Sequence, residues 1–174
     1  MASDLTKNEF WLKKMTARFH ALDLNKDGVL TKADFDIFTE RTIQIGKLSE
    51  AQAERNWKLH NEILSAYGDE NLKLTLAGFF EATAKYAEGD YQAIVGNKFF
   101  DVIDTDGDGI ISYNEWAVYF ECIGTDVKHA RPCFDALDTN KDGELSRSEF
   151  VDAMVNFSRS TDESHPSRFA YGPI

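Results

Sequence analysis

Apolar residues recur at helical spacing on both sides of three short polar segments. Those before the polar segments are Phe19, Leu22, Phe99, Phe100, Ile103, Cys133, Phe134 and Leu137, and those after them are Phe35, Phe38, Trp116, Tyr119, Phe120, Phe150 and Met154. Gaps of three and four residues are typical of helices that bury one stripe. We therefore predict repeated units of helix, loop and helix, with these side chains in the core.

The three polar segments align without gaps as one repeated pattern. They read DLNKDGVLTKAD (23–34), DTDGDGIISYNE (104–115) and DTNKDGELSRSE (138–149). Each has oxygen-bearing side chains at positions 1, 3, 5 and 9, glycine at 6, an aliphatic residue at 8 and a carboxylate at 12. This is the pattern of the EF-hand calcium loop. Three copies in one register predict three Ca²⁺ sites.

The predicted ligands follow from the loop positions, because Ca²⁺ takes roughly six to eight oxygens. They are Asp23, Asn25, Asp27, the Val29 carbonyl, Thr31 and Asp34 in the first loop; Asp104, Asp106, Asp108, the Ile110 carbonyl, Ser112 and Glu115 in the next; and Asp138, Asn140, Asp142, the Glu144 carbonyl, Ser146 and Glu149 in the last. The position-9 hydroxyls are expected to contact the ion directly or through water. With the position-12 carboxylates they also form the capping-box pattern that begins a helix.

A degenerate repeat, YGDENLKLTLAG (67–78), lies between the first two complete ones, with Leu74 at the aliphatic position 8. The first ligand, the turn glycine and the last carboxylate are replaced there by Tyr67, Leu72 and Gly78. Asp69 and Asn71 alone cannot enclose an ion. We predict that this second hand binds no metal and serves as the structural partner of the first.

Composition narrows the function classes further. The 174 residues carry a formal charge of −11, which repels phosphate backbones, so we expect no nucleic-acid partner. No apolar stretch approaches the roughly 20 residues of a membrane span, and the start MASDLTKNEF has no apolar segment, so we expect neither a membrane span nor a secretory signal. Cys122 and Cys133 are expected to be reduced and buried, and the chain to be a cytoplasmic monomer. We find no nucleophile motif, phosphate loop or zinc cluster, so we expect no enzyme activity.

Complete first, third and fourth hands with a silent second hand resemble the invertebrate sarcoplasmic calcium-binding proteins. The segment WLKKMTARFHALDLNKDG, the Asp at position 34 and the ending FAYGPI add to the resemblance. The same superfamily includes coelenterazine (luciferin)-binding proteins and calcium-activated photoproteins.

The resemblance implies an all-α fold of four EF-hand units, in two pairs packed as one compact globule. Its parts would be an N-terminal pair (1–90), a C-terminal pair (91–160) and a tail (161–174) folded back on the core. Gly89 and Gly96 agree with this, since both are expected to weaken a long central helix between the pairs.

Three functions stay open at this point. The first is a Ca²⁺ buffer, with a mixed Ca²⁺/Mg²⁺ site in the Asp23–Asp34 loop because Asp34 is shorter than the usual Glu. The second, implied by the resemblance, is a carrier that binds coelenterazine, a small apolar ligand, and releases it with calcium. The third is a calcium sensor with a protein partner. The sequence has three methionines, whereas sensor surfaces are rich in this flexible residue.

Overall fold

The computed structural model describes residues 2–67 and 71–174. Its N-terminal half comprises α1 (Ala2–Leu5), α2 (Glu9–Leu22), β1 (Val29–Leu30), α3 (Lys32–Ile45), α4 (Glu50–Tyr67), β2 (Leu74–Thr75) and α5 (Leu76–Lys85). Its C-terminal half comprises α6 (Tyr91–Ile103), β3 (Ile110–Ile111), α7 (Tyr113–Cys122), η2 (Val127–His129), α8 (Ala130–Leu137), β4 (Leu145–Ser146), α9 (Arg147–Arg159) and η3 (Pro166–Phe169). The first to fourth hands are thus α2–α3, α4–α5, α6–α7 and α8–α9. Among the described residues, no helix is both long and apolar enough to cross a membrane.

Short antiparallel ladders join the hands in pairs. β1 pairs with β2, with Leu30 opposite Leu74, and β3 pairs with β4, with Ile111 opposite Leu145. All four residues occupy position 8 of their loops, so the register confirms the alignment of the degenerate repeat on Leu74.

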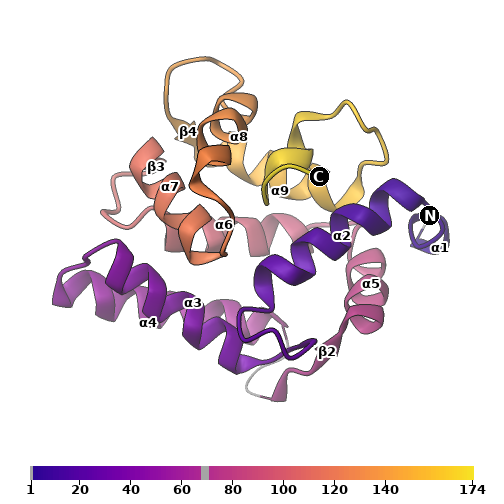
Figure 1. The fold of residues 1–174 in the computed structure, drawn as a ribbon, viewed down its shortest axis with the longest axis horizontal. Helices are drawn as coiled ribbons and strands as arrows, with labels where there is room; N and C mark the ends of the chain where they lie inside the picture. Colours follow the sequence, from indigo (N-terminus) through magenta and orange to yellow (C-terminus); the bar gives the residue numbers. More distant parts are fainter. Residues whose placement is uncertain (1, 68–70) are drawn as a thin grey trace.

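The two pairs of hands form one body. Helix α6 packs against α4 of the first pair as well as α9 of its own, and α3 packs against α7. Figure 1 shows α2 crossing the molecule in front of α6, with α3 and α4 along one side and the third and fourth hands along the other. The predicted all-α fold of two EF-hand pairs in one globule is confirmed.

All fifteen apolar side chains that the helical spacing assigned to the core are buried. Trp116 is fully buried and its ring lies 5.0 Å from that of Phe120 and 6.4 Å from that of Phe150. Large aromatic side chains, rather than flexible ones, therefore fill the centre of the C-terminal pair.

The two glycines of the central segment have different roles. Gly89 lies in the break between α5 and α6 and has a φ of +84°, a conformation that glycine adopts without steric cost. Gly96 lies inside α6 and does not interrupt it. A Cβ at Gly96 would lie 3.4 Å from Cβ of Met154 and 3.7 Å from Cα of Val151. A methyl group at this position would therefore be in ordinary van der Waals contact with α9.

Helix α2 is tied to the end of α9 by buried polar groups. The Trp11 indole N–H donates to the Ser158 carbonyl at 2.8 Å, and Lys14 Nζ donates to the carbonyls of Phe157 and Ser160, each at 2.7 Å. The last carbonyls of a helix have no partner within it, so α2 satisfies them in α9.

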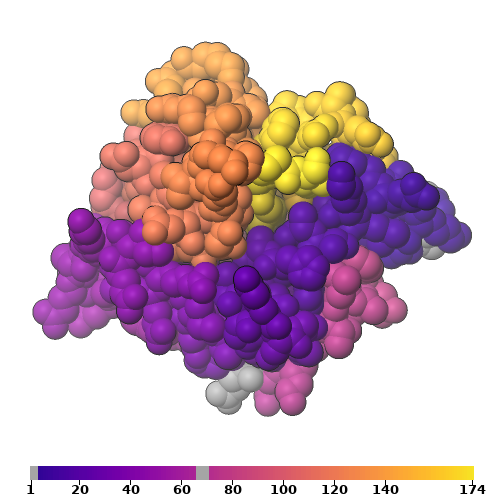
Figure 2. Space-filling model, viewed as in Figure 1, coloured from indigo at the N-terminus to yellow at the C-terminus, as the bar shows by residue number. Residues whose placement is uncertain are grey.

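The tail after α9 returns to the body of the protein. Figure 2 shows it beside α2, with η3 packed on α8 and α9. Tyr171 is buried and its ring centroid lies 4.9 Å from that of Phe157. Cys122 and Cys133, as expected, are free and buried.

Candidate metal centres

Each complete loop begins where its entering helix ends. The N–H groups of Asp23, Asp104 and Asp138 donate to carbonyls four residues earlier, at 2.8, 2.8 and 2.9 Å, as the last helical bonds of α2, α6 and α8. Each of these aspartates is nevertheless buried. The helices therefore deliver one carboxylate to the interior side of each loop.

The loops turn by the same backbone conformation. At position 4 the φ angles of Lys26, Gly107 and Lys141 are +61°, +77° and +62°, and at position 6 those of Gly28, Gly109 and Gly143 are +83°, +93° and +89°. Left-handed φ values are unfavourable for residues with a Cβ, so glycine at position 6 relieves the turn. Lys26 and Lys141 adopt this conformation despite their side chains.

Backbone N–H groups orient the first carboxylate. Gly28 donates to Asp23 Oδ2 at 3.0 Å, Gly109 to Asp104 Oδ2 at 3.1 Å, and Gly143 to Asp138 Oδ2 at 3.0 Å. Each glycine at position 6 thus permits the turn and also holds the carboxylate at position 1.

Positions 3 and 5 are linked in the same way in every loop. The side-chain oxygen at position 3 accepts from the N–H of position 5, and the carboxylate at position 5 accepts from the N–H of position 7. The six bonds are between 2.9 and 3.1 Å long. They link Asn25, Asp27 and Val29 in the first loop, Asp106, Asp108 and Ile110 in the third hand, and Asn140, Asp142 and Glu144 in the fourth. Hydrogen bonds from the backbone of each loop therefore orient the predicted side-chain ligands at positions 1, 3 and 5.

The position-12 carboxylate crosses each loop. In the third hand Glu115 Oε1 accepts from the N–H of Thr105 at 2.8 Å, while Oε2 accepts from the N–H of Ser112 at 2.9 Å. Glu149 makes the corresponding contacts with Thr139 and Ser146, at 2.9 and 3.0 Å. The capping-box pairs form as predicted at the start of α3, α7 and α9.

The surroundings shift the carboxyl pKa values in opposite directions. Burial opposes ionisation of Glu149, but hydrogen bonds from Ser146, Thr139 and Asn140 outweigh it and lower its pKa to about 2. The pKa of Asp104 is raised, chiefly by burial and also by the nearby Glu115 carboxylate. The N–H groups of Gly109 and Gly107 and the Arg55 charge act in the opposite direction and only partly offset this increase. A carboxylate that is costly to bury as an anion is stabilised by a cation.

Two observations show that the residues present fit a cation. Asp23 Oδ1 is buried and has no hydrogen-bond partner among the described residues. Asp104, Asp106 and Asp108 bring one oxygen each within 4.8 Å of the others. Hard oxygen ligands at this density suit Ca²⁺ or Mg²⁺.

The described part of the second hand differs from the three complete loops. Leu72, at the position of the turn glycine, is buried and does not adopt the left-handed conformation. Thr75 Oγ1 accepts from the N–H of Gly78 at 3.3 Å, which is half of a capping box without a returning carboxylate. We predict that Tyr67 replaces the first ligand, but its side chain lies outside the described part of the structure, and so does Asp69.

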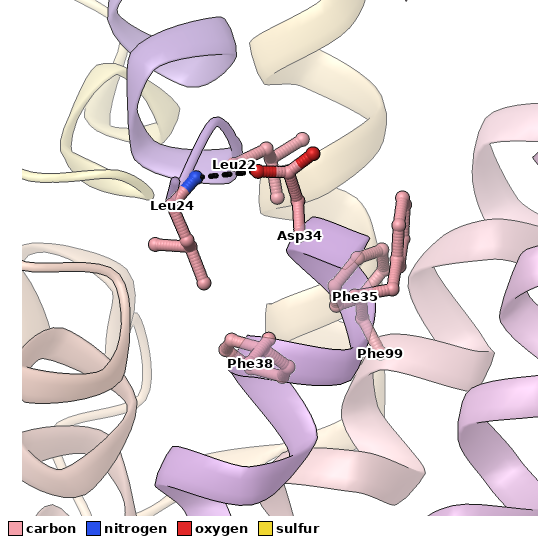
Figure 3. Close-up of a pocket in the computed structure, with 6 residues that line it drawn as sticks. All are labelled: Leu22, Leu24, Asp34, Phe35, Phe38 and Phe99. Atoms are coloured by element: carbon pink, nitrogen blue, oxygen red, sulfur yellow. Dashed lines mark hydrogen bonds between the residues drawn. The ribbon is translucent and has the colours of Figure 1, made fainter. Parts of the chain in front are cut away.

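The first site has a shorter last carboxylate. Asp34 Oδ1 accepts from the N–H groups of Leu24 and Asn25 at 2.9 and 3.2 Å, and Oδ2 from that of Thr31 at 2.9 Å. Figure 3 shows Asp34 at the start of α3 reaching toward Leu24. Beside it lies a cavity of about 10 Å³, with Phe35, Phe38 and Phe99 in its wall. This is about the space of one water molecule.

Sequence reasoning missed contacts to the third loop from another hand. Gln52 Nε2 donates to the carbonyl of Thr105 at 3.1 Å, and Arg55 Nη1 to that of Asp104 at 2.8 Å. Both donors lie on α4, about 50 positions away in the chain, and no local pattern marks them.

Comparisons with known proteins agree with this geometry. A family described as an EF-hand domain pair matches residues 97–155, and one described as an EF hand matches residues 16–38. The sarcoplasmic calcium-binding protein of Perinereis vancaurica tetradentata is 32% identical over 96% of this chain and 99% of its own. The luciferin-binding protein of Renilla reniformis is 26% identical over 97% of each chain.

Among solved structures, the calcium-loaded apo form of the coelenterazine-binding protein from Renilla muelleri has a TM-score of 0.86 to this chain. It is 26% identical, and the match covers 96% of this chain and 97% of that one. Together with the loop geometry, these matches support calcium binding through EF-hands. Identity over nearly the full length of the Perinereis protein places the chain in the family of sarcoplasmic calcium-binding proteins.

Proposed function

We propose that this chain is a cytoplasmic Ca²⁺ buffer that binds three ions, in the first, third and fourth hands. One observation carries the proposal: all three loops bury their first carboxylate and orient their side chains at positions 3, 5 and 12 by the same hydrogen bonds. The ligands are those predicted from the loop pattern. Three ions would change the formal charge from −11 to −5.

The buried core favours a buffer over a sensor. Calcium sensors expose a flexible groove rich in methionine when they open. Here Met15 and Met154 are buried, and the interior is built from aromatic rings such as Trp116 and Phe150. Contacts between α3 and α7, and between α4 and α6, hold the two pairs together, so opening one pair would disturb the other.

Calorimetric titration of the metal-free protein tests the proposal. We expect three Ca²⁺ per chain, two in Glu149→Gln and three in the matched second-hand variant Asn71→Ala. A fourth ion, or loss of one ion in Asn71→Ala, would show that the second hand binds metal. Fewer than three ions in the unmodified protein would overturn the assignment of one of the loops.

A carrier of coelenterazine is the second candidate. The two Renilla proteins that resemble this chain over nearly its whole length are named for binding luciferin or coelenterazine. The interior also holds buried cationic groups among aromatic rings: Lys14 Nζ lies 5.1 Å from the Phe157 ring centroid, and Arg18 Cζ lies 5.5 Å from that of Tyr171. An aromatic ligand with polar substituents would suit such surroundings.

The two candidates predict different fluorescence results. Trp11 is fully buried, and both it and Arg18 donate hydrogen bonds to Ser158, so a ligand bound there would quench the emission of Trp11. A carrier would show saturable quenching by coelenterazine without calcium, reversed by calcium and absent in Trp11→Phe. A buffer would show no saturable quenching in either state, and this is the result we expect.

A further inference from the structure

Helix α4 of the silent second hand docks on the third calcium loop. Gln52, Arg55 and Asn56 lie on consecutive turns of α4 and donate to the carbonyls of Thr105, Asp104 and Val102, at 3.1, 2.8 and 3.2 Å. Asn56 is buried in this contact. The N-terminal pair thus supplies a cationic side chain to an ion site of the C-terminal pair.

The third loop has four acids among its predicted side-chain ligands, whereas the first and fourth loops have three each. Position 3 is Asp106 there, whereas the first and fourth loops have Asn25 and Asn140. Each asparagine donates its side-chain N–H to the carboxylate at position 5, at 3.0 Å in the first loop and 2.8 Å in the fourth. Asp106 has no such donor when ionised, so carboxylate repulsion is greatest in the third loop.

Arg55 lies at that loop. Its Nη1 bonds the first carbonyl of the loop, and its Cζ lies 3.8 Å from where a Cβ of Gly107 would be. The guanidinium therefore lies against the turn that holds the Asp104 carboxylate, and a glycine at position 4 leaves room for it. Arginine keeps its charge at every physiological pH.

We propose that Arg55 is the resident counter-ion of the third site: it stabilises the ion-free loop, with its additional carboxylate, and lowers the affinity of that loop for Ca²⁺. This proposal rests on calcium binding by the third loop, as proposed above. A positive charge lowers the energy of clustered carboxylates and raises that of a cation bound among them. Arg55 thus sets the calcium affinity of the third site without being one of its ligands.

Loss of the charge should therefore have opposite effects on the two states. In Arg55→Gln a side-chain donor remains but the charge is gone, so the metal-free protein should be less stable. The affinity of the third site for Ca²⁺ should increase about three- to tenfold, the range expected for one partly exposed charge. Arg55→Lys keeps the charge and should stay within about twofold of the unmodified protein.

A matched control is available on the same two helices. Lys98 Nζ lies 3.1 Å from Glu62 Oε2, so this pair also joins α6 to α4 through a cation, away from the loop. Lys98→Gln removes one positive charge and one contact between these helices. It should leave the affinity of the third site within about twofold of the unmodified protein, as expected for an exposed pair.

The three position-6 glycine amides allow each loop to be followed separately by NMR. Gly28, Gly109 and Gly143 each donate to the first carboxylate of their own loop, so their amide resonances report on that loop during a Ca²⁺ titration. In Arg55→Gln, the Gly109 transition should move to lower calcium while the other two stay in place. A Gly109 resonance that does not respond in the unmodified protein would instead refute calcium binding by the third loop.

Salt separates an electrostatic effect from a structural one. The gain in Arg55→Gln should shrink between low salt and about 1 M salt, where charges are screened within about 3 Å. Weaker or unchanged Ca²⁺ binding, as reported by Gly109 in Arg55→Gln, would overturn the proposal. Arg55 would then only stabilise the contact between α4 and the third loop. A gain of equal size at high salt, or an equal gain in Lys98→Gln, would also overturn it.

Discussion

Leu30 and Leu74 stand opposite each other in the short ladder between the first two hands. Leu30 is buried in a loop with a full set of predicted ligands, and Leu74 belongs to a loop that lacks the turn glycine and the last carboxylate. The second hand therefore supports the first loop by backbone pairing and apolar contact.

Substitution of Leu74 by alanine should weaken the first site. Cross-strand pairs contribute roughly 0.2–1 kcal/mol, so we expect a loss of about two- to fivefold in Ca²⁺ affinity at that site. The Gly28 amide should report the change during titration, while the Gly109 and Gly143 amides of the other pair should not. Equal losses at all three loops would mean general destabilisation of the fold.

Lys14 should make stability depend on pH in an unusual direction. Burial lowers its pKa from 10.5 to about 8, so the folded protein releases this proton at lower pH than the unfolded chain does. Below pH 8 both states hold the proton and the cost of burying the charge is complete. Above pH 8 the unfolded state binds more protons, and stability rises by up to about 1.4 kcal/mol per pH unit.

The measurement compares unfolding free energies of the unmodified protein and Lys14→Met from about pH 7.5 to pH 9. The unmodified protein should gain stability relative to the variant across this window. Higher pH is less informative, because burial raises the pKa of Cys122 and Cys133 to about 11 and ionisation of these thiols then favours unfolding. Parallel pH profiles would show that Lys14 stays charged in the folded protein.

Close approach in the tail should make Gly172 sensitive to substitution. Its φ is +100°, and a Cβ there would lie 2.9 Å from Cγ2 of Thr125. Gly172→Ala should therefore cost about 1–3 kcal/mol and loosen the tail. Gly96→Ala is the matched control, because its Cβ would meet Met154 at an ordinary 3.4 Å. Proteolysis of the tail should be faster in Gly172→Ala than in Gly96→Ala. Equal rates would show that the backbone around Gly172 relaxes to accommodate the added methyl group.

Exposure of apolar surface separates a buffer from a sensor. If the chain is a buffer, an apolar dye should bind the calcium-loaded form no more strongly than the metal-free form. The core aromatics, Trp116 and Phe120 among them, are already buried. Stronger dye binding with calcium, together with capture of an amphipathic peptide, would favour a sensor instead.

Local pattern was enough to predict the loops but not the contacts between hands. The predicted ligands at positions 1 to 12 follow from one repeated motif, and the register of Leu74 follows from its place in that motif. The docking of Arg55 on Asp104 and of Trp11 on Ser158 depends on how distant helices pack, which no short window encodes. Gly96 shows the same limit, since a glycine between two helices, such as Gly89, and one inside a helix look alike in sequence.

Asp34 sets the last prediction, because it reaches the same loop N–H groups as Glu115 and Glu149 with one methylene fewer. The start of α3 must therefore lie closer to its loop, and fewer oxygens suit Mg²⁺, which takes about six ligands at roughly 2.0–2.1 Å. We expect the first site to accept both Ca²⁺ and Mg²⁺. In Asp34→Glu the longer side chain would push α3 outward, since the adjoining cavity of about 10 Å³ has little room for it. That variant should show weaker Mg²⁺ competition at the Gly28 amide, with the Gly109 and Gly143 amides unchanged. If calcium titrations of the two proteins in millimolar Mg²⁺ superimpose, the length of the side chain at position 34 does not set ion selectivity.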